Sequence, residues 1–288
     1  MSTSPTRRLV RDLHRDSTQW DSFQPRTDDI VIASSYRSGT TLTQQIINLL
    51  IHGPDDICHF RHRSPWVDSI ELYPGPAAVE AIKARRFLKS HLPFDALPQH
   101  KGWRYVYLVR DGRDVCLSLF EHSRALARER PFDRNGVAFD YGAADFPTFY
   151  DRWLEDGHPY WPQWSDIASW WTARSRRDVV LIRFDALVGD KARVVRELAS
   201  FLDLRWTPEI GEMVTRCSSL AHMQALERAG KFGKPEPKDE AKFINKGIAG
   251  RWRELLTTAQ AERYEALLED RLPPACVDWI RSGSDKAP

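Results

Sequence analysis

Four short segments of this chain carry side chains suited to binding anions and moving a proton. The first is Ser34–Thr41, a Ser/Gly/Thr-rich turn that contains Arg37 and follows the apolar run Ile30–Ala33. Apolar residues at helical spacing come next, so the pattern predicts a strand, a tight turn and a helix. Such a turn gathers free backbone N–H groups at the positive end of the helix dipole. Because Gly39 is followed by Thr40 and not by lysine, the turn lacks the Gly-Lys-Ser/Thr ending of an ATP-binding loop. We expect a phosphate-like ligand here, although an ordinary strand-to-helix turn is the alternative for this segment taken alone.

The second segment is Lys89-Ser90-His91-Leu92-Pro93. A short apolar stretch precedes it and Pro93 ends regular structure, which predicts that His91 lies at the tip of a strand. A single histidine in a loop is most often a solvated surface residue. Its place beside Lys89 and downstream of an anion-binding turn favours a functional residue instead.

The third segment runs from Tyr105 to Ser118. Its first five residues are apolar or aromatic and predict a buried strand, which ends at Arg110. Ser118 follows eight residues later, on a predicted helix. A surface ion pair and a helix-filling serine are the alternatives for these two residues taken singly. The fourth segment lies near the C-terminus and combines a lysine, two glycines and a tryptophan over Asn245–Trp252.

In this order and at these separations, the four segments resemble the motifs of the cytosolic-type sulfotransferases that use 3′-phosphoadenosine 5′-phosphosulfate (PAPS). That family carries Thr-Tyr-Pro-Lys-Ser-Gly-Thr-Thr-Trp, then Lys-Thr-His-Leu-Pro, then an arginine with a serine eight residues later, and finally Arg-Lys-Gly-x-x-Gly-Asp-Trp. The departures of the present chain from the pattern include Tyr36 for proline, Arg37 for lysine, Leu42 for tryptophan, Asn245 for arginine and Arg251 for aspartate. The resemblance, to a bacterial-like member, extends from the first strand almost to the C-terminus.

The resemblance implies an α/β fold, a single domain with a central parallel sheet flanked by helices and a P-loop-like nucleotide site. It also implies in-line transfer of a sulfuryl group from PAPS to a hydroxyl or amine of a small, apolar or aromatic acceptor. In that reaction His91 is the base, Arg37 stabilises the leaving oxygen and Lys89 contacts the sulfonate. No metal is expected, because protein cations do the work that Mg²⁺ does in kinases.

The residues that the resemblance assigns to the co-substrate fall into three groups. The 5′-phosphate is held by Arg37, Ser38, Gly39, Thr40 and Thr41; the 3′-phosphate by Arg110, Ser118, Asn245, Lys246 and Gly247; and the adenine by Phe184, Ser218 and Leu220. Asparagine at 245 removes the bidentate phosphate ligand that an arginine would provide.

The order of elements predicts one parallel sheet with helices on both faces, because strands alternate with helical material. The strands are expected near Asp29–Ser34, Arg86–Lys89, Trp103–Val109 and Val179–Phe184. We expect a single domain over residues 1–288, with an N-terminal extension over about 1–25, an aromatic acceptor-side insertion over 124–171 and a mobile lid over 231–250. More than half of the rings in that insertion are expected to pack its own helices.

Composition fits an enzyme of 288 residues with a formal net charge of +2, too small to indicate nucleic acid as a partner. The four cysteines have no Cys-x-x-Cys spacing, and the N-terminus has no apolar signal region, so we expect a cytoplasmic protein without a membrane anchor. A homodimer through residues 253–262 is implied by the resemblance, with Thr258 in place of the family's valine. The alternatives are a nucleotide kinase or other phosphotransferase, and a catalytically silent nucleotide-binding module. The sequence leaves the identity of the acceptor open.

Overall fold

The computed structural model describes residues 7–54, 60–129, 145–231 and 249–282. Its strands are β1 (Ile30–Ser34), β2 (Phe87–Ser90), β3 (Arg104–Val109) and β4 (Val179–Arg183). Its α-helices are α1 (Thr40–His52), α2 (Phe60–Arg63), α3 (Pro76–Glu80), α4 (Gly112–Glu129), α5 (Phe146–Asp156), α6 (Gln163–Thr172), α7 (Phe184–Gly189), α8 (Lys191–Phe201), α9 (Pro208–Cys217), α10 (Leu220–Arg228), α11 (Thr258–Arg271) and α12 (Pro274–Ser282). Three 3₁₀ turns complete the described part: η1 (Ser17–Asp21), η2 (Phe94–Ala96) and η3 (Arg251–Glu254).

The four strands form one parallel sheet in the order β2-β1-β3-β4. Each strand begins and ends within one residue of its predicted range, and the predicted parallel α/β fold is confirmed. The central strand β1 is buried along its whole length, as a strand covered on both faces must be. All four carboxyl ends meet at one edge of the sheet, which is where a ligand site is expected in such folds.

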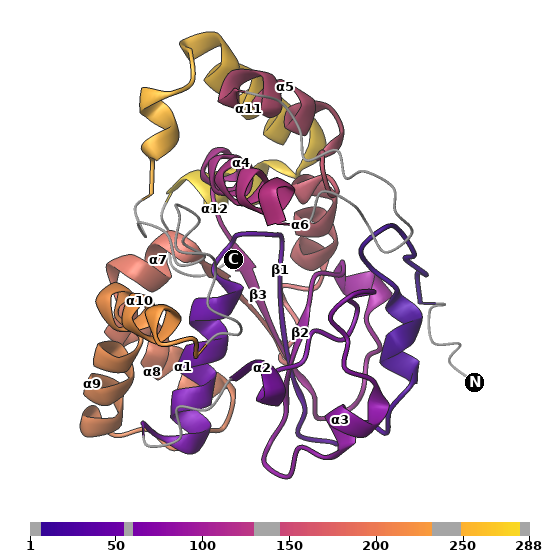
Figure 1. Cartoon of the computed structure of the whole chain (residues 1–288), viewed down its shortest axis with the longest axis vertical. Helices are drawn as coiled ribbons and strands as arrows, with labels where there is room; N and C mark the ends of the chain where they lie inside the picture. The colour runs from indigo at the N-terminus through magenta and orange to yellow at the C-terminus, as the bar shows by residue number, and fades with distance from the viewer. Residues whose placement is uncertain (1–6, 55–59, 130–144, 232–248, 283–288) are drawn as a thin grey trace.

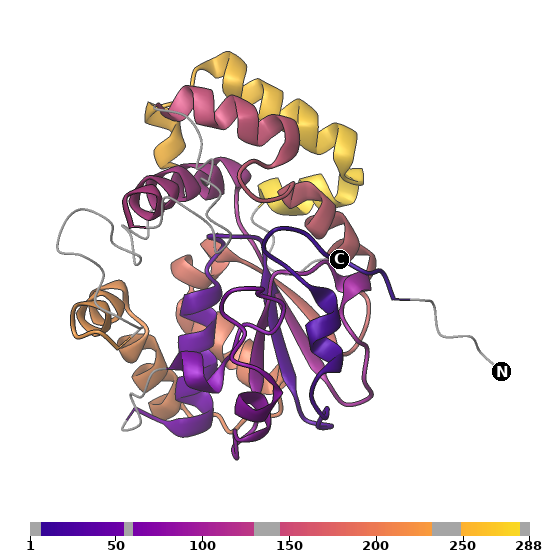
Figure 2. The same ribbon diagram turned by 45° about the vertical axis from the view of Figure 1, so that its right-hand side comes forward.

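Alternate residues of each strand belong to two separate cores. Ile30 and Ile32 of β1 pack with α1, α8 and α9 on one face, whereas Val31 and Ala33 pack with α4, α5, α6 and the C-terminal helices on the other. Figures 1 and 2 show the two layers, with α8, α9 and α10 gathered beside α1 and with α5 and α11 beyond α4. The two-residue period of the strands thus fixes which helices cover each face.

The described part of the N-terminal segment, residues 7–23, is packed against the domain. Trp20 and Phe23 are buried, and Arg15 pairs with Ser69 in an antiparallel bridge. The Asp16 N–H donates to the Asp68 carbonyl over 2.9 Å. Within the N-terminal extension predicted over about 1–25, Val10, Trp20 and Phe23 join the same core as the sheet, whereas Leu9 and Leu13 are exposed.

Within the aromatic region predicted over 124–171, α5 lies beyond α4 (Figure 1), whereas α6 packs against the sheet, where the Trp170 ring stacks on Tyr107 of β3. Most of the region's described rings are buried in the core, among them Phe149, Tyr150 and Trp153, which α5 carries. This agrees with the expectation that most of them pack the helices. Residues 130–144, and residues 232–248 of the predicted lid, lie outside the described part of the chain. No helix within the described ranges is both long and apolar enough to cross a membrane.

Candidate active site

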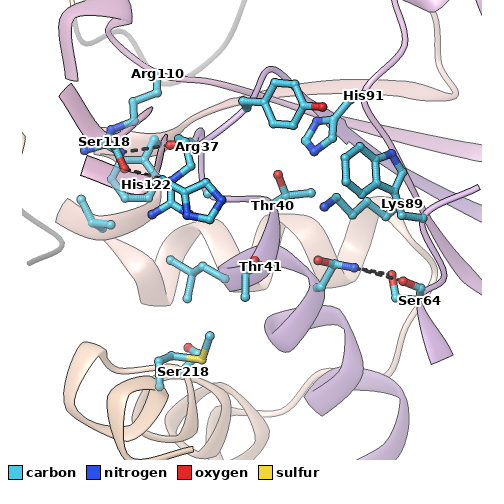
Figure 3. Close-up of a pocket in the computed structure, with 18 of the residues that line it drawn as sticks. Arg37, Thr40, Thr41, Ser64, Lys89, His91, Arg110, Ser118, His122 and Ser218 are labelled. Carbon is cyan, nitrogen blue, oxygen red and sulfur yellow. Dashed lines mark hydrogen bonds between the residues drawn. The ribbon is translucent and has the colours of Figure 1, made fainter. Parts of the chain in front are cut away.

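A cavity of about 1120 Å³ opens at the carboxyl edge of the sheet, slightly larger than the usual range of about 300–1,000 Å³ for ligand pockets. It is lined by residues from the ends of β1, β2, β3 and β4 and from α1, α4 and α10. Figure 3 shows Arg110, Ser118 and Arg37 on one side of Thr40, and His91 and Lys89 on the other. The cavity therefore brings the first three sequence motifs together.

The turn between β1 and α1 requires glycine at position 39 for two reasons. Gly39 has a left-handed φ of 101°, and a Cβ atom there would lie 2.6 Å from the Phe184 ring. Helix α1 starts at the next residue, so the N–H groups of its first turn are directed toward the cavity end of the helix. Arg37 also has a left-handed φ, of 59°, which is uncommon for a side chain of this size. The turn thus places two residues with left-handed φ directly before the N-terminus of α1, where free N–H groups can bind an anion.

The cationic side of the cavity is a connected cluster of Arg37, Arg110, Ser118 and Phe184. The Arg37 Nε donates to the Ser118 Oγ over 3.0 Å, and the Arg110 Nη1 donates to the Arg37 carbonyl over 3.0 Å. The Arg110 guanidinium lies 4.6 Å from the Phe184 ring centre. The Arg110 Nε is buried and has no hydrogen-bond partner within the described structure. A buried donor of this kind costs free energy unless a ligand accepts from it.

His91 lies on the other side of the cavity (Figure 3), and a hydrogen bond from its ring fixes its orientation. Its Nδ1 is 2.6 Å from the Ser34 carbonyl oxygen, which can only accept, so Nδ1 carries the proton and Nε2 holds the lone pair. Burial, and then the positive charge of Lys89, lower the pKa of His91 well below its ordinary 6.5. The ring is therefore neutral, and able to accept a proton, throughout the neutral pH range.

Aromatic rings surround this histidine. The ring centres of Tyr36 and Trp66 lie 4.6 and 4.8 Å from that of His91, and the Tyr160 ring lies 4.0 Å from Tyr36. The Lys89 Nζ lies 3.9 Å from the Trp66 ring centre. Tyr160 is the only described ring of the predicted insertion that lines the cavity; the remaining rings come from the β1–α1 turn, the chain before β2 and the start of α7. The aromatic wall is thus built mainly outside the insertion.

The structure places the other predicted site residues less uniformly. Thr40 and Thr41 line the cavity, whereas Ser38 is buried and its Oγ donates to the Tyr36 carbonyl. Ser218 lines the cavity, but its hydroxyl donates to the Val214 carbonyl over 2.7 Å within α9. Leu220 lines the cavity and is partly exposed. Asn245, Lys246 and Gly247 lie outside the described residues.

Several residues around the cavity were missed at the sequence level. His14 and His122 line it, and the buried Asp68 accepts the His91 N–H over 2.9 Å. Arg251 also lines it and pairs with Glu121 through two hydrogen bonds. These contacts join segments far apart in the chain. His14, Asp68 and His122 lie outside the four sequence motifs, whereas Arg251 belongs to the fourth, where it stands at the family's aspartate. Within the described ranges, no three His, Cys, Asp or Glu side chains are grouped as they would be around a metal ion.

Asp166 of α6 supplies a pH-dependent contribution to stability beside the site. Its carboxylate accepts from the Trp161 Nε1 over 2.6 Å, and burial raises its pKa from 3.8 to about 7. Because the folded-state pKa is raised, the stabilising effect of this proton is complete below the ordinary pKa and is lost as the pH rises through about 7.

We therefore expect Asp166→Asn to flatten the pH dependence of stability. Between pH 5 and 8 the free energy of unfolding of the wild type should fall by about 2–3 kcal/mol more than that of the variant. Urea unfolding at both pH values measures this difference, with the exposed Asp270→Asn as the matched control. Equal losses in the wild type and in Asp166→Asn would show that Asp166 titrates in the ordinary acidic range.

Comparison with known proteins agrees with this geometry. The model of the sulfotransferase domain family matches residues 27–273. The chain is 26% identical over 311 residues to a glycolipid sulfotransferase of Mycobacterium bovis, covering 96% of this chain and 94% of that protein. It is 25% identical over 276 residues to human sulfotransferase 2A1, covering 90% of each.

Solved structures share the fold. A mouse sulfotransferase, SULT7A1, complexed with PAP matches with a TM-score of 0.72 at 19% identity, over 92% of each chain. A retinol dehydratase in complex with androsterone and PAP matches with a TM-score of 0.73 at 20% identity, over 89% of this chain and 84% of that one. The family model covers most of the chain and the fold is shared, so the chain belongs to the sulfotransferase domain family and is an enzyme that transfers sulfate.

Proposed function

We propose that this enzyme transfers the sulfuryl group of PAPS to a hydroxyl or amine of a small apolar or aromatic acceptor, with His91 as the base. The observation that carries the proposal is the layout of the cavity. A histidine with a fixed lone pair lies on one side of the α1 N-terminus, and a cluster of arginine and serine lies on the other (Figure 3).

The cationic side fits a nucleotide that bears two phosphate groups. The N-terminus of α1 suits the 5′-phosphate, and the Arg110 guanidinium with the neighbouring Ser118 hydroxyl suits the 3′-phosphate (Figure 3). The two solved neighbours hold PAP, which is the same nucleotide without its sulfuryl group. Lys246 stays a predicted ligand of the 3′-phosphate. When bound, PAPS supplies a sulfuryl group already activated for transfer.

Three residues of the cavity then have separate roles in the transfer. His91 accepts the acceptor's proton at Nε2 while its Nδ1–H stays on the Ser34 carbonyl, which holds the ring in one tautomer. Lys89 and Arg37 offset the negative charge on the transferring group and on the leaving oxygen. Arginine at 37 acts only as a fixed cation, because it does not lose its proton at working pH.

The acceptor side favours a flat or apolar molecule. Tyr36, Trp66 and Tyr160 present rings next to His91, and Leu72 and Pro74 continue the wall. Such a surface gains most from an aromatic or polycyclic body with one hydroxyl near the base. The androsterone in the retinol dehydratase structure and the glycolipid in the name of the mycobacterial relative show that related proteins handle large apolar bodies.

The other predictions on partners are also proposals. We propose a cytoplasmic location and a homodimer through residues 253–262. That segment spans the end of η3 and the start of α11, where Thr257 caps the helix and forms a capping box with Gln260. Neither the kinase nor the silent-module alternative is favoured by an observation on this structure.

Two measurements on the wild-type chain test the proposed function. Calorimetry should show PAP binding at least tenfold more tightly than ATP, because the cationic cluster suits a 3′-phosphate and the turn lacks the lysine of an ATP-binding loop. Mixtures of PAPS with phenols, sterols and aryl amines, followed by product mass, should show a gain of one sulfuryl group. Tighter binding of ATP than of PAP would refute the proposal, and PAP binding without transfer to any acceptor would favour the silent module.

A further inference from the structure

Three separate contacts hold His91, and two of them come from outside the sequence motifs. Its Nδ1 donates to the Ser34 carbonyl, and its N–H donates to the Asp68 Oδ2 over 2.9 Å. Its own carbonyl oxygen accepts from the Arg15 Nη1 over 2.8 Å. Every polar group of this residue except Nε2 is therefore tied, and Nε2 is the atom that must face the acceptor.

Arg15 can position the histidine because it is itself immobilised. Its side chain is 7% exposed, and its Nε and Nη2 each lie 2.9 Å from the Asp12 Oδ2. Its guanidinium lies 3.4 Å from the centre of the Trp161 ring, and its Nη1 lies 3.7 Å from the Asp166 Oδ2. A planar cation held on an aromatic face by the Asp12 carboxylate has little freedom to move.

The same N-terminal segment also supports the second contact. The Trp20 Nε1 donates to the Asp68 Oδ1 over 3.2 Å, and the Asp16 N–H donates to the Asp68 carbonyl. Residues 7–23 thus make one of the three contacts to His91 and share the support of a second with Trp66, whose Nε1 donates to the Asp68 Oδ2 over 2.9 Å. These residues lie ahead of the part matched by the family model, 27–273. The segment is joined to the base directly through Arg15 and indirectly through Asp68.

We infer that Arg15 is a positioning residue for His91 and that residues 7–23 are part of the active site. The inference rests on the proposed function, in which His91 is the base. A base acts only when its lone pair lies within hydrogen-bond reach of the acceptor's proton, and an error of about 1 Å can cost about 100-fold in rate. Arg15 holds the backbone carbonyl of His91, and so fixes the backbone position from which the imidazole ring extends.

The charge of Arg15 affects the pKa of His91, and a purely structural role of Arg15 would not change that pKa. Arg15 and Lys89 are the cations next to His91, and both favour its neutral form. Asp68 accepts the His91 N–H, Tyr36 stacks on its ring, and Asp166 lies behind Arg15. Loss of the Arg15 charge in Arg15→Gln should raise the pKa of His91. Arg15→Lys should leave that pKa unchanged, because the charge is kept, although lysine cannot make the forked contacts of the guanidinium.

The experiment compares Arg15→Gln, Arg15→Lys and Asp12→Asn with the wild type, using PAPS and 2-naphthol as probes. Asp12→Asn can keep the Oδ1 atom that accepts the His14 and Arg15 N–H groups, but it replaces the Oδ2 atom that contacts the Arg15 guanidinium. It therefore offers a milder test if Arg15→Gln does not fold. Arg11→Gln is the matched control, because Arg11 lies on the same segment with its side chain 82% exposed. An NMR titration of the His91 imidazole in the PAP-bound protein is followed in parallel, since it needs no acceptor.

We expect kcat to fall about 10- to 100-fold in Arg15→Gln, less in Asp12→Asn and not at all in Arg11→Gln, with PAP affinity within about twofold throughout. The pKa of His91 should rise in Arg15→Gln and not in Arg15→Lys. An unchanged kcat and an unchanged His91 pKa would overturn the inference, as would parallel losses of kcat, PAP binding and melting temperature. If the wild type does not sulfate 2-naphthol, the titration alone decides; failure of the wild type to bind PAP would instead refute the proposed function.

Discussion

Replacement of His91 by alanine is expected to lower kcat for sulfuryl transfer by about 10²- to 10⁴-fold, the usual contribution of a positioned general base. The affinity for PAP should change little, because the ring lies on the opposite side of Thr40 from Arg110 and Ser118 (Figure 3). Single-turnover kinetics with PAPS and an acceptor found in the screen, together with calorimetry of PAP, measure the two effects separately.

A second variant separates the loss of the base from a disturbance of the fold. Alanine at 91 leaves the buried Ser34 carbonyl without its donor, at a cost of about 1–3 kcal/mol in stability. In His91→Asn the side-chain amide can still donate to that carbonyl, although it offers no base. Both variants should be equally inactive, and His100→Ala, a histidine packed on Trp103 outside the cavity, should remain active. Substantial turnover by His91→Asn would exclude His91 as the base.

The pH profile provides an independent view of the same residue. Since burial and Lys89 lower the pKa of His91, the acidic limb of kcat/KM should have its midpoint below 6.5. The neutral form is the active form, so activity should persist as the pH falls through 6.5 and be lost only at lower pH. A midpoint above 6.5 would assign the limb to another group.

The sheet and the strand tips that line the cavity could be predicted because their signals are local. Each strand is an apolar run that ends at a turn residue, and parallel strands bring their carboxyl ends to one edge. Arg37, His91 and Arg110 therefore meet in the cavity although up to 73 residues separate them. The two-residue period of the strands and the glycine at the tight turn are enough to predict that these strand ends meet, without knowledge of the tertiary packing.

The support around His91 could not be predicted in the same way. Arg15 reaches the His91 carbonyl across 76 residues of chain, and nothing in its neighbourhood distinguishes it from the exposed Arg11. The burial of Trp20 and Phe23 could have been suspected from their size, because two large rings on a supposed extension need a core to cover them. The aromatic insertion posed the opposite problem, since ring content alone does not tell a packing residue from a cavity wall.

Replacement of Arg110 by alanine is expected to weaken PAP binding by about 10- to 150-fold, the equivalent of one charge-assisted hydrogen bond of about 1.5–3 kcal/mol. The affinity for AMP, which has no 3′-phosphate, should change less than about threefold. The reason is that AMP carries only the 5′-phosphate, which we assign to the N-terminus of α1. Arg110 and Ser118 lie beyond that N-terminus, on the side of the cavity away from His91 (Figure 3). Calorimetry with both nucleotides gives the ratio directly.

Ser118→Ala tests the same site without removing a charge. The Ser118 Oγ accepts from the Arg37 Nε, so its loss removes one proposed ligand of the 3′-phosphate and one support of a neighbouring cation. We expect a smaller loss of PAP affinity than in Arg110→Ala, again with little effect on AMP. Arg124→Ala, an exposed arginine on the same helix, is the matched control and should bind both nucleotides as the wild type does. If Arg110→Ala and Ser118→Ala weaken PAP and AMP equally, the two residues support the turn through the Arg37 carbonyl and do not read the 3′-phosphate.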